Sequence, residues 1–183
     1  MTPNGIETLT NPHPRGHIVY PYTTESQIAE AVCLFASAGL RKGEAVLLVM
    51  TEAHYKPVRD RLEEEGFSFA SMVATGRLIC QDAESLLNTF LSDGILNEHR
   101  FRTTIGGMIE EAKSASGNRP VRVFGEMVDM IWTSNPKATE RLEELWNDVI
   151  DAHSVPLLCA YSLSGSRPTL PAVLLGCHSH AVA

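Results

Sequence analysis

The sequence predicts an α/β protein, a three-layer α/β/α sandwich with a mainly parallel central sheet. Between residues 16 and 163, five short apolar runs alternate with segments of helical periodicity. Strands that are separated by helices form βαβ crossovers, which make the strands parallel and cover both faces of the sheet. The 183 residues, 44% of them hydrophobic, can build a single core of this kind, since domains usually span roughly 100–200 residues.

Five apolar runs are the predicted strands. They occupy residues 17–20, 45–50, 77–80, 121–124 and 156–161. The second run, Ala45 to Met50, is apolar at every position. Such a continuous run is typical of a parallel strand that is buried on both faces.

Helical patterns fill the connections between these runs. Thr23 or Thr24 is expected to cap the first helix, and Gly39 is expected to end it. The remaining helices are expected over residues 55–65, from Asp82 onward, over residues 97–115 and from the Asn135-Pro136 pair onward. A helix that starts with Asn followed by Pro has its N-cap and first position well defined.

The two ends of the chain are expected to lie outside this core. Proline-rich residues 1–15 are predicted to form a flexible N-terminal arm, residues 16–163 the folded domain, and residues 164–183 a tail. A short apolar run at residues 172–175 is expected either to add an edge strand or to pack on the surface.

Charge and composition exclude several classes of protein. With 15 Lys+Arg against 22 Asp+Glu, the net charge is -7, which argues against direct binding of nucleic acid. No apolar run approaches the ~20 residues that span a bilayer, and the N-terminus lacks the features of a signal peptide. The four cysteines form no C-x-x-C pair. We therefore expect a cytoplasmic protein with reduced thiols and no membrane contact.

Glu126 is the first candidate for a ligand site. Parallel sheets bind ligands beyond the carboxyl ends of their strands, and Glu126 directly follows an apolar strand and Gly125. A carboxylate is costly to bury there unless it is paired or ligand-bound. The alternative is an acidic residue that is stabilised by the dipole of the following helix.

Five further residues complete the predicted ligand-binding set. His17 lies within the first strand and is either a core histidine or part of a polar site. Glu52 and His54 follow the second strand, where they either face the site or belong to the first turn of the next helix. Tyr20 and Tyr161 end strands, so each either lines the crevice or packs at its rim.

Several motifs of catalysis and metal binding are absent. The sequence contains no G-x-x-x-x-G-K-[ST] phosphate loop, no G-x-G-x-x-G fingerprint and no G-x-S-x-G elbow. The tail sequence from Cys177 to His180 has metal-ligating residue types but no second half-site with zinc spacing. No catalytic residue and no metal site are predicted, and any cofactor stays unknown.

Seven segments together resemble the MEDS domain, the sensory domain of methanogens and methylotrophs named after the regulator DcmR. They are residues 17–20, 35–49, 62–67, 76–78, 124–128, 142–147 and 157–161. The resemblance covers about residues 15–163. It implies a sensory role and a fold similar to that of RecA and KaiC ATPases without their nucleotide-binding loop. The matching site positions are His17, Tyr20, Glu126 and Tyr161, with His54 as a weaker addition.

The resemblance and the residues lead to one main hypothesis and two alternatives. The main hypothesis is a non-enzymatic sensory domain that binds a small molecule at the carboxyl ends of the strands. It would signal to a partner, a histidine kinase or a transcription regulator on another chain, with a homo-oligomer as a further option. The alternatives are an enzyme that uses Glu126 and His17 as an acid–base pair, and a pure protein-interaction adaptor. Nucleotide binding without turnover is a further variant.

Overall fold

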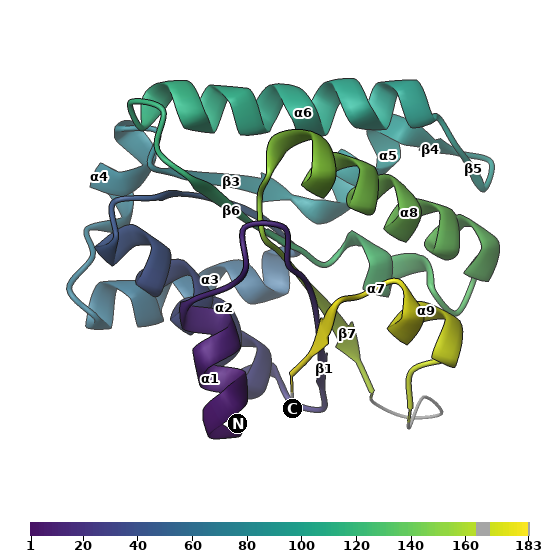
Figure 1. The fold of residues 1–183 in the computed structure, drawn as a ribbon, viewed down its shortest axis with the longest axis horizontal. Coiled ribbons are helices and arrows are strands. Elements are labelled where there is room, and N and C mark those ends of the chain that lie inside the picture. Colours follow the sequence, from purple (N-terminus) through teal and green to yellow (C-terminus); the bar gives the residue numbers. More distant parts are fainter. Residues whose placement is uncertain (164–168, 183) are drawn as a thin grey trace.

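The computed structural model describes residues 1–163 and 169–182 and confirms the α/β fold (Figure 1). Residues 164–168, which belong to the predicted tail, and residue 183 lie outside the described part of the chain. Within it, the central sheet has six parallel strands in the order β3-β2-β6-β7-β1-β8. These strands are β1 (His17–Tyr22), β2 (Ala45–Met50), β3 (Leu78–Asp82), β6 (Val121–Gly125), β7 (Leu157–Ser162) and β8 (His180–Ala181).

Helices cover both faces of the sheet. They are α1 (Pro3–Thr10), α2 (Glu25–Arg41), α3 (Glu52–Glu64), α4 (Phe69–Ala74), α5 (Ala83–Phe90), α6 (Glu98–Ala115), α7 (Met127–Ile131), α8 (Pro136–His153) and α9 (Ala172–Gly176). A small antiparallel hairpin of β4 (Leu91–Ser92) and β5 (Ile95–Leu96) joins α5 to α6.

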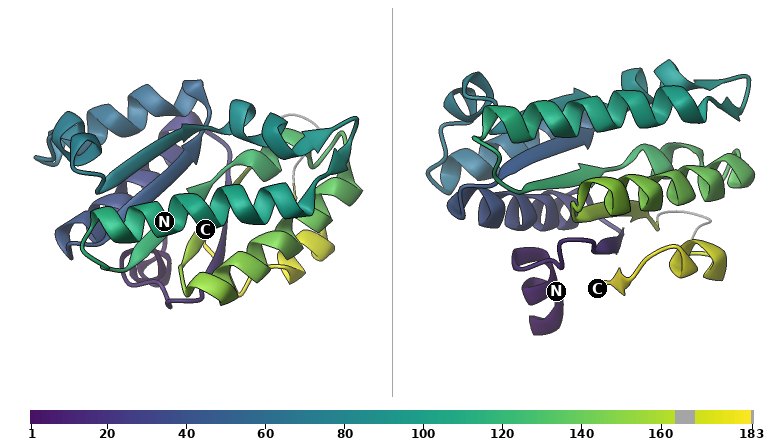
Figure 2. Two further views of the ribbon diagram at one scale, coloured as in Figure 1. Left: turned by 90° about the horizontal axis from the view of Figure 1, so that it is seen from above. Right: turned by 45° about the horizontal axis from the view of Figure 1, so that its top comes forward.

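The two layers of helices enclose two separate hydrophobic cores. On one face, α5 to α8 pack on the sheet, and α6 and α8 lie side by side (Figure 2). On the other face, α1, α2 and α3 pack together. Because side chains alternate along a strand, Val19 of β1 enters the first core, whereas Ile18 and Tyr20 enter the second. This alternation decides where the predicted site residues lie.

All five predicted strands are present, and most predicted helix starts are confirmed. Thr24 is the N-cap of α2, and its side chain accepts a hydrogen bond from the backbone N–H of Gln27. Asp82, Asn97 and Asn135 cap α5, α6 and α8 in the same way. Helix α3 begins at Glu52, three residues earlier than the predicted start at residue 55.

The ends of the chain are more ordered than the sequence suggests. Instead of a loose arm, residues 3–10 form α1, whose Leu9 is fully buried against α2. The apolar run at residues 172–175 forms α9 rather than a strand, and the edge strand is β8 at residues 180–181. Chain start and chain end lie close together (Figure 1). A side-chain carbon at Gly5 would come within 2.9 Å of Val182.

Gly39 does not end α2, contrary to the sequence prediction, because the helix continues to Arg41. The reason for a glycine at this position is a close approach from the sheet. A Cβ atom at residue 39 would lie 2.5 Å from Nε of Arg122, which is buried on β6. The turn after the helix is made by Gly43, whose φ of +79° favours glycine.

We expect Gly39→Ala to destabilise the protein by about 1–3 kcal/mol, as overpacking of a core does. The matched control is Gly107→Ala on α6, where an added Cβ meets no atom within 4 Å. There the better helix propensity of alanine should stabilise the protein by up to about 1 kcal/mol. Urea unfolding of both variants measures the difference. Equal effects of the two substitutions would contradict the close approach of Arg122 to Gly39.

None of the helices in the described part of the chain is long and apolar enough to cross a membrane.

Candidate functional site

The six predicted site residues lie in three different places. Glu126, His54 and Glu52 gather at the carboxyl edge of the sheet. His17 and Tyr161 meet a buried glutamate of α8 on one face of the sheet. Tyr20 lies in the hydrophobic core on the opposite face. The separation of His17 from Tyr20 follows from the strand itself, because residues three apart on a strand point to opposite faces.

At the carboxyl edge, His54 connects two carboxylates from distant parts of the chain. Its Nδ1 lies 2.5 Å from Oε2 of Glu126, and its Nε2 lies 2.5 Å from Oε2 of Glu25. The backbone N–H of Thr51 donates to the other oxygen of Glu126. These four residues, Glu25, Thr51, His54 and Glu126, are called the edge network below. It ties together the starts of α2, α3 and α7.

The electrostatics of the edge network favour a charged imidazole. Burial alone would lower the pKa of His54, but the hydrogen bond and negative charge of Glu126, together with Glu25, outweigh it and raise the pKa above 6.5. Both ring nitrogens then donate to carboxylates. Glu126 is only 2% exposed, whereas the side chain of Glu25 is 72% exposed. The network therefore connects a buried charge to solvent.

A small cavity of about 160 Å³ lies beside the edge network. Its lining comes from the ends of β2 and β3 and the first turn of α3: Met50, Thr51, Glu52, Tyr55, Cys80, Gln81 and Asp82. Thr51 belongs both to the lining and to the edge network. The volume corresponds to about five water molecules at ~30 Å³ each, so the cavity suits a molecule of a few heavy atoms.

On the sheet face beneath α8, Glu143 is a fully buried carboxylate. Its Oε2 lies 3.2 Å from Nε2 of His17 and 3.9 Å from Sγ of Cys159. Its Oε1 accepts a hydrogen bond from the hydroxyl of Tyr161 and lies 3.4 Å from Nε2 of His178. We call these five residues the buried cluster. They come from β1, β7, α8 and the segment between α9 and β8.

The pKa values in the buried cluster are shifted by burial and by the neighbouring charges. Burial, with a contribution from His17, lowers the pKa of His178 to about 4. Burial and the charge of Glu143 raise the pKa of the Cys159 thiol. For Glu143 itself, burial would raise the pKa, but hydrogen bonds from His17 and Tyr161 outweigh it and lower the pKa. At neutral pH the cluster thus holds a carboxylate, a neutral His178 and a thiol.

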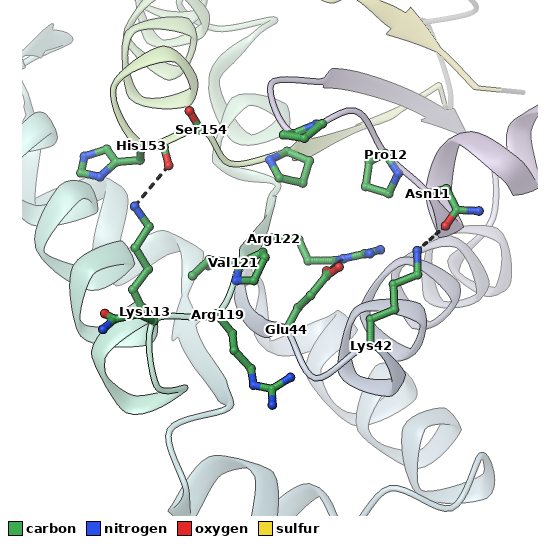
Figure 3. Close-up of a pocket in the computed structure, with 14 residues that line it drawn as sticks. Asn11, Pro12, Lys42, Glu44, Lys113, Arg119, Val121, Arg122, His153 and Ser154 are labelled. Atoms are coloured by element: carbon green, nitrogen blue, oxygen red, sulfur yellow. Dashed lines mark hydrogen bonds and ion pairs between the residues drawn. The ribbon is translucent and has the colours of Figure 1, made fainter.

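A larger cavity of about 480 Å³ opens at the opposite ends of the strands, where β2, β6 and β7 begin (Figure 3). Its cations are largely engaged by the protein itself. Lys42 binds the carbonyl of Thr10 at 2.9 Å, Lys113 binds the carbonyl of His153 at 3.2 Å, and Arg122 pairs with Glu44. These contacts link α1 to the end of α2 and α6 to the end of α8.

Several residues of these sites were not singled out from the sequence. Glu143 falls on the buried stripe of α8 with Leu142 and Trp146, and its charge on that stripe was an available signal. Glu25 lies in the first turn of α2, where a favourable interaction with the helix dipole explains an acidic residue equally well. His178 was noted only as part of a tail without zinc spacing, because its partners are distant in the sequence.

Comparison with known families agrees with the resemblance drawn from the residues. A family model described as the MEthanogen/methylotroph, DcmR Sensory domain (MEDS) matches residues 16–179. The matched region starts at the predicted domain start and extends beyond residue 163 to include α9 and His178. No curated protein matches the chain significantly.

Proposed function

Since this chain belongs to the family of MEDS sensory domains, we propose that it binds a small organic molecule in the cavity beside the edge network and signals this state to a partner protein. The observation that carries the proposal is the double role of Thr51, which lines the cavity and also donates to the buried Glu126. A ligand in the cavity therefore touches the network that holds three helices together.

The chemistry of the cavity favours a ligand that donates hydrogen bonds. Glu52 and Asp82 contribute carboxylates, and Thr51 and Gln81 contribute further polar groups, while Met50 and Tyr55 supply apolar surface. A short alkylamine or alcohol fits this combination, since its polar head meets oxygen acceptors and its carbon chain meets apolar atoms. In the larger cavity at the amino ends, Lys42, Lys113 and Arg122 bind protein groups.

The edge network provides the route of the signal. Thr51 and Glu52 begin α3, and His54 in the same turn binds Glu25 of α2 and Glu126 before α7. A ligand that binds one arrangement of this turn more tightly than another shifts the population between them. The displaced starts of α2 and α7 would then present a changed surface to a histidine kinase or a transcription regulator.

The proposal treats the protein as a cytoplasmic sensor rather than an enzyme. Its four cysteines are all free thiols, which is typical of a reducing compartment. The acid–base pair of the enzyme alternative, His17 and Glu126, has no shared partner among the described contacts. His17 binds Glu143, Asn147 and Cys159, whereas Glu126 binds Thr51 and His54.

We expect members of a panel of straight-chain amines and alcohols, from one to five carbons, to raise the melting temperature of the protein. Binding to the native state stabilises it by mass action. Glu52→Gln should remove this increase for amines, because it removes a carboxylate from the cavity wall. Glu64→Gln, at the other end of α3 and outside this cavity, is the matched control. A thermal-shift assay measures all three proteins.

The assay also separates this proposal from its alternatives. If no panel member shifts the melting temperature, the small-ligand proposal fails. If Glu52→Gln responds as strongly as the wild type, the ligand does not bind at the carboxyl edge. Consumption of a bound amine or alcohol, followed by chromatography, would favour the enzyme alternative.

A further inference from the structure

The buried cluster brings four metal-ligating side chains together within a small volume. One ligand atom from each of His17, Glu143, Cys159 and His178 lies within 4.8 Å of all the others. Nε2 of His17 lies 3.2 Å from Oε2 of Glu143 and 3.3 Å from Sγ of Cys159, which is 3.9 Å from the same oxygen. Nε2 of His178 lies 3.4 Å from the other oxygen of Glu143, Oε1. A tetrahedral zinc ion with bonds of about 2.0–2.3 Å holds its ligand atoms roughly 3.2–3.8 Å apart. The cluster is therefore close to the size of a tetrahedral metal site.

Both histidines are oriented as metal ligands usually are. Nδ1 of His17 lies 2.9 Å from Oδ1 of Asn147, whose amide nitrogen donates to the carbonyl of Cys177. Nδ1 of His178 lies 2.7 Å from the carbonyl of Leu174. In the metal-bound form, each Nδ1–H would donate to its oxygen, and each Nε2 would offer its lone pair to the ion. Metal-bound histidines show this outer hydrogen bond almost without exception.

One of these lone pairs has no partner. Nε2 of His178 is buried and makes no hydrogen bond within the described part of the chain, and the side chain is only 1% exposed. Leaving a buried polar atom unsatisfied costs about 1–3 kcal/mol. An unprotonated histidine nitrogen of this kind is a common ligand for a metal ion.

The charges of the cluster also match a divalent ion. Glu143 contributes one negative charge, and Cys159 contributes a second when it binds metal as a thiolate. A divalent cation with two neutral histidines then leaves the fully buried site with no net charge, which avoids the cost of an uncompensated buried ion. We infer that His17, Glu143, Cys159 and His178 form a binding site for one divalent transition-metal ion, with Zn²⁺ as the best match to two nitrogens, one sulfur and one oxygen.

The proposed ion would fasten the C-terminal segment to the sheet. His178 lies between α9 and β8, whereas the other three ligands come from β1, α8 and β7. Four protein ligands leave no open position, which is the pattern of a structural rather than a catalytic zinc site. This inference concerns the sheet face beneath α8 and does not depend on the ligand proposed for the carboxyl edge.

Cobalt provides a direct spectroscopic test. We expect the full chain, freed of metal with a chelator, to bind one equivalent of Co²⁺ with the intense visible bands of tetrahedral cobalt and a near-ultraviolet thiolate-to-cobalt band. One equivalent of Zn²⁺ should abolish these bands and raise the melting temperature above that of the chelator-treated protein. Both measurements use the wild-type protein, so they do not depend on the folding of a variant.

Two pairs of variants locate the ion. Cys159→Ser should remove the thiolate-to-cobalt band, whereas Cys177→Ser, in the same tail as His178 but outside the cluster, should retain it. His178→Ala should weaken Co²⁺ binding by more than about 100-fold, and His180→Ala should leave it unchanged. Asn147→Leu removes the outer hydrogen bond of His17 and the hydrogen bond to the Cys177 carbonyl but no metal ligand, and should weaken binding by about 10–100-fold.

Three results would overturn the inference. The first is a wild-type protein that shows no tetrahedral cobalt spectrum. The second is a spectrum that survives in Cys159→Ser with its thiolate band intact. The third is loss of binding in Cys177→Ser and His180→Ala but not in His178→Ala, which would place the metal on the exposed tail. Far-ultraviolet circular dichroism of each variant shows whether it retains the wild-type fold.

Discussion

Replacing Arg122 by methionine is expected to lower the free energy of unfolding by about 3–5 kcal/mol, the range measured when one partner of a buried ion pair is removed. Arg122 lies on the central strand β6 and is only 1% exposed. Its Nε pairs with Glu44, whose side chain is 17% exposed. Methionine has a similar length but no charge, so it would leave this carboxylate partly buried without its cation.

The hydrogen bonds of Arg122 add to the effect. Its guanidinium donates to the carbonyls of Leu9 at 3.2 Å, Phe35 at 3.0 Å and Thr10 at 3.4 Å. It also lies over the Phe35 ring, 5.2 Å from the ring centre. One side chain thus ties the sheet to the end of α1 and the middle of α2. Its loss removes a donor from the carbonyls of Leu9 and Phe35, at a cost of about 1–3 kcal/mol for a group left buried and unpaired, whereas the Thr10 carbonyl keeps the hydrogen bond from Lys42.

Urea unfolding at neutral pH measures this prediction, with Arg102→Met as the matched control. Arg102 also forms two ion pairs, with Glu98 and Asp148, but its side chain is 43% exposed. Exposed ion pairs contribute roughly 0–1 kcal/mol. If both substitutions have equally small effects, Arg122 does not hold the three elements together. In a thermal melt, the expected loss corresponds to a decrease of roughly 6–20 °C, at about 2–4 °C per kcal/mol for a domain of this size.

Arg122 also shows why the N-terminal helix could not be predicted. Residues 1–15 contain no periodic apolar face that would indicate a stable helix, and isolated helices shorter than about 12–15 residues are marginal in water. Helix α1 is held by contacts with residues that are distant in the sequence. Leu9 packs in the core of the α2 face, and Arg122 donates to the carbonyls of Leu9 and Thr10 at the end of α1. Local sequence patterns carry no information about such contacts, whereas the five strands and most helix caps are local and were predictable.

The same distinction applies to the candidate site. Glu126 and His54 follow adjacent parallel strands, and their proximity follows from the rule that ligands bind beyond the carboxyl ends of such strands. This rule does not predict the contact between His17 and Glu143, because Glu143 lies on α8, a helix that crosses the sheet face. Period-two alternation would have separated His17 from Tyr20 at the sequence level. The position of His178 depends on α9 and β8, two short elements without a clear sequence signal.

The edge network is expected to make stability depend on pH in a defined direction. His54 has a pKa above its ordinary value of 6.5 in the folded protein. Its ion pairs therefore contribute fully below the pKa of the unfolded chain, and this contribution is lost as the pH rises through the folded pKa. The groups that contact His54 are the carboxylates of Glu126 and Glu25 and the Thr51 hydroxyl, and the Tyr22 ring lies nearly perpendicular to the imidazole.

Glu126→Gln should expose this dependence most clearly. At pH 6, the substitution leaves a buried, charged His54 with only the exposed Glu25 as counter-charge. We expect a loss of about 3 kcal/mol in the free energy of unfolding, the lower end of the range for a broken buried pair. At high pH, where the imidazole is neutral, the glutamine oxygen can accept from the backbone N–H of Thr51, and the glutamine NH2 can donate to the unprotonated Nδ1 of His54. The difference between wild type and variant should therefore shrink as the pH rises.

Urea unfolding between pH 5.5 and 9 tests this expectation for the wild type, Glu126→Gln and His54→Gln. Glu111→Gln, at an exposed position of α6, is the control for a glutamate change outside the network. His17 and His178 are present in every one of these proteins, so any effect of theirs cancels in the differences between variants that lie far from them. If the loss in Glu126→Gln stayed constant across this range, His54 would not carry the charge. The edge network would then hold α2, α3 and α7 by neutral hydrogen bonds alone, and protonation could not influence the signal.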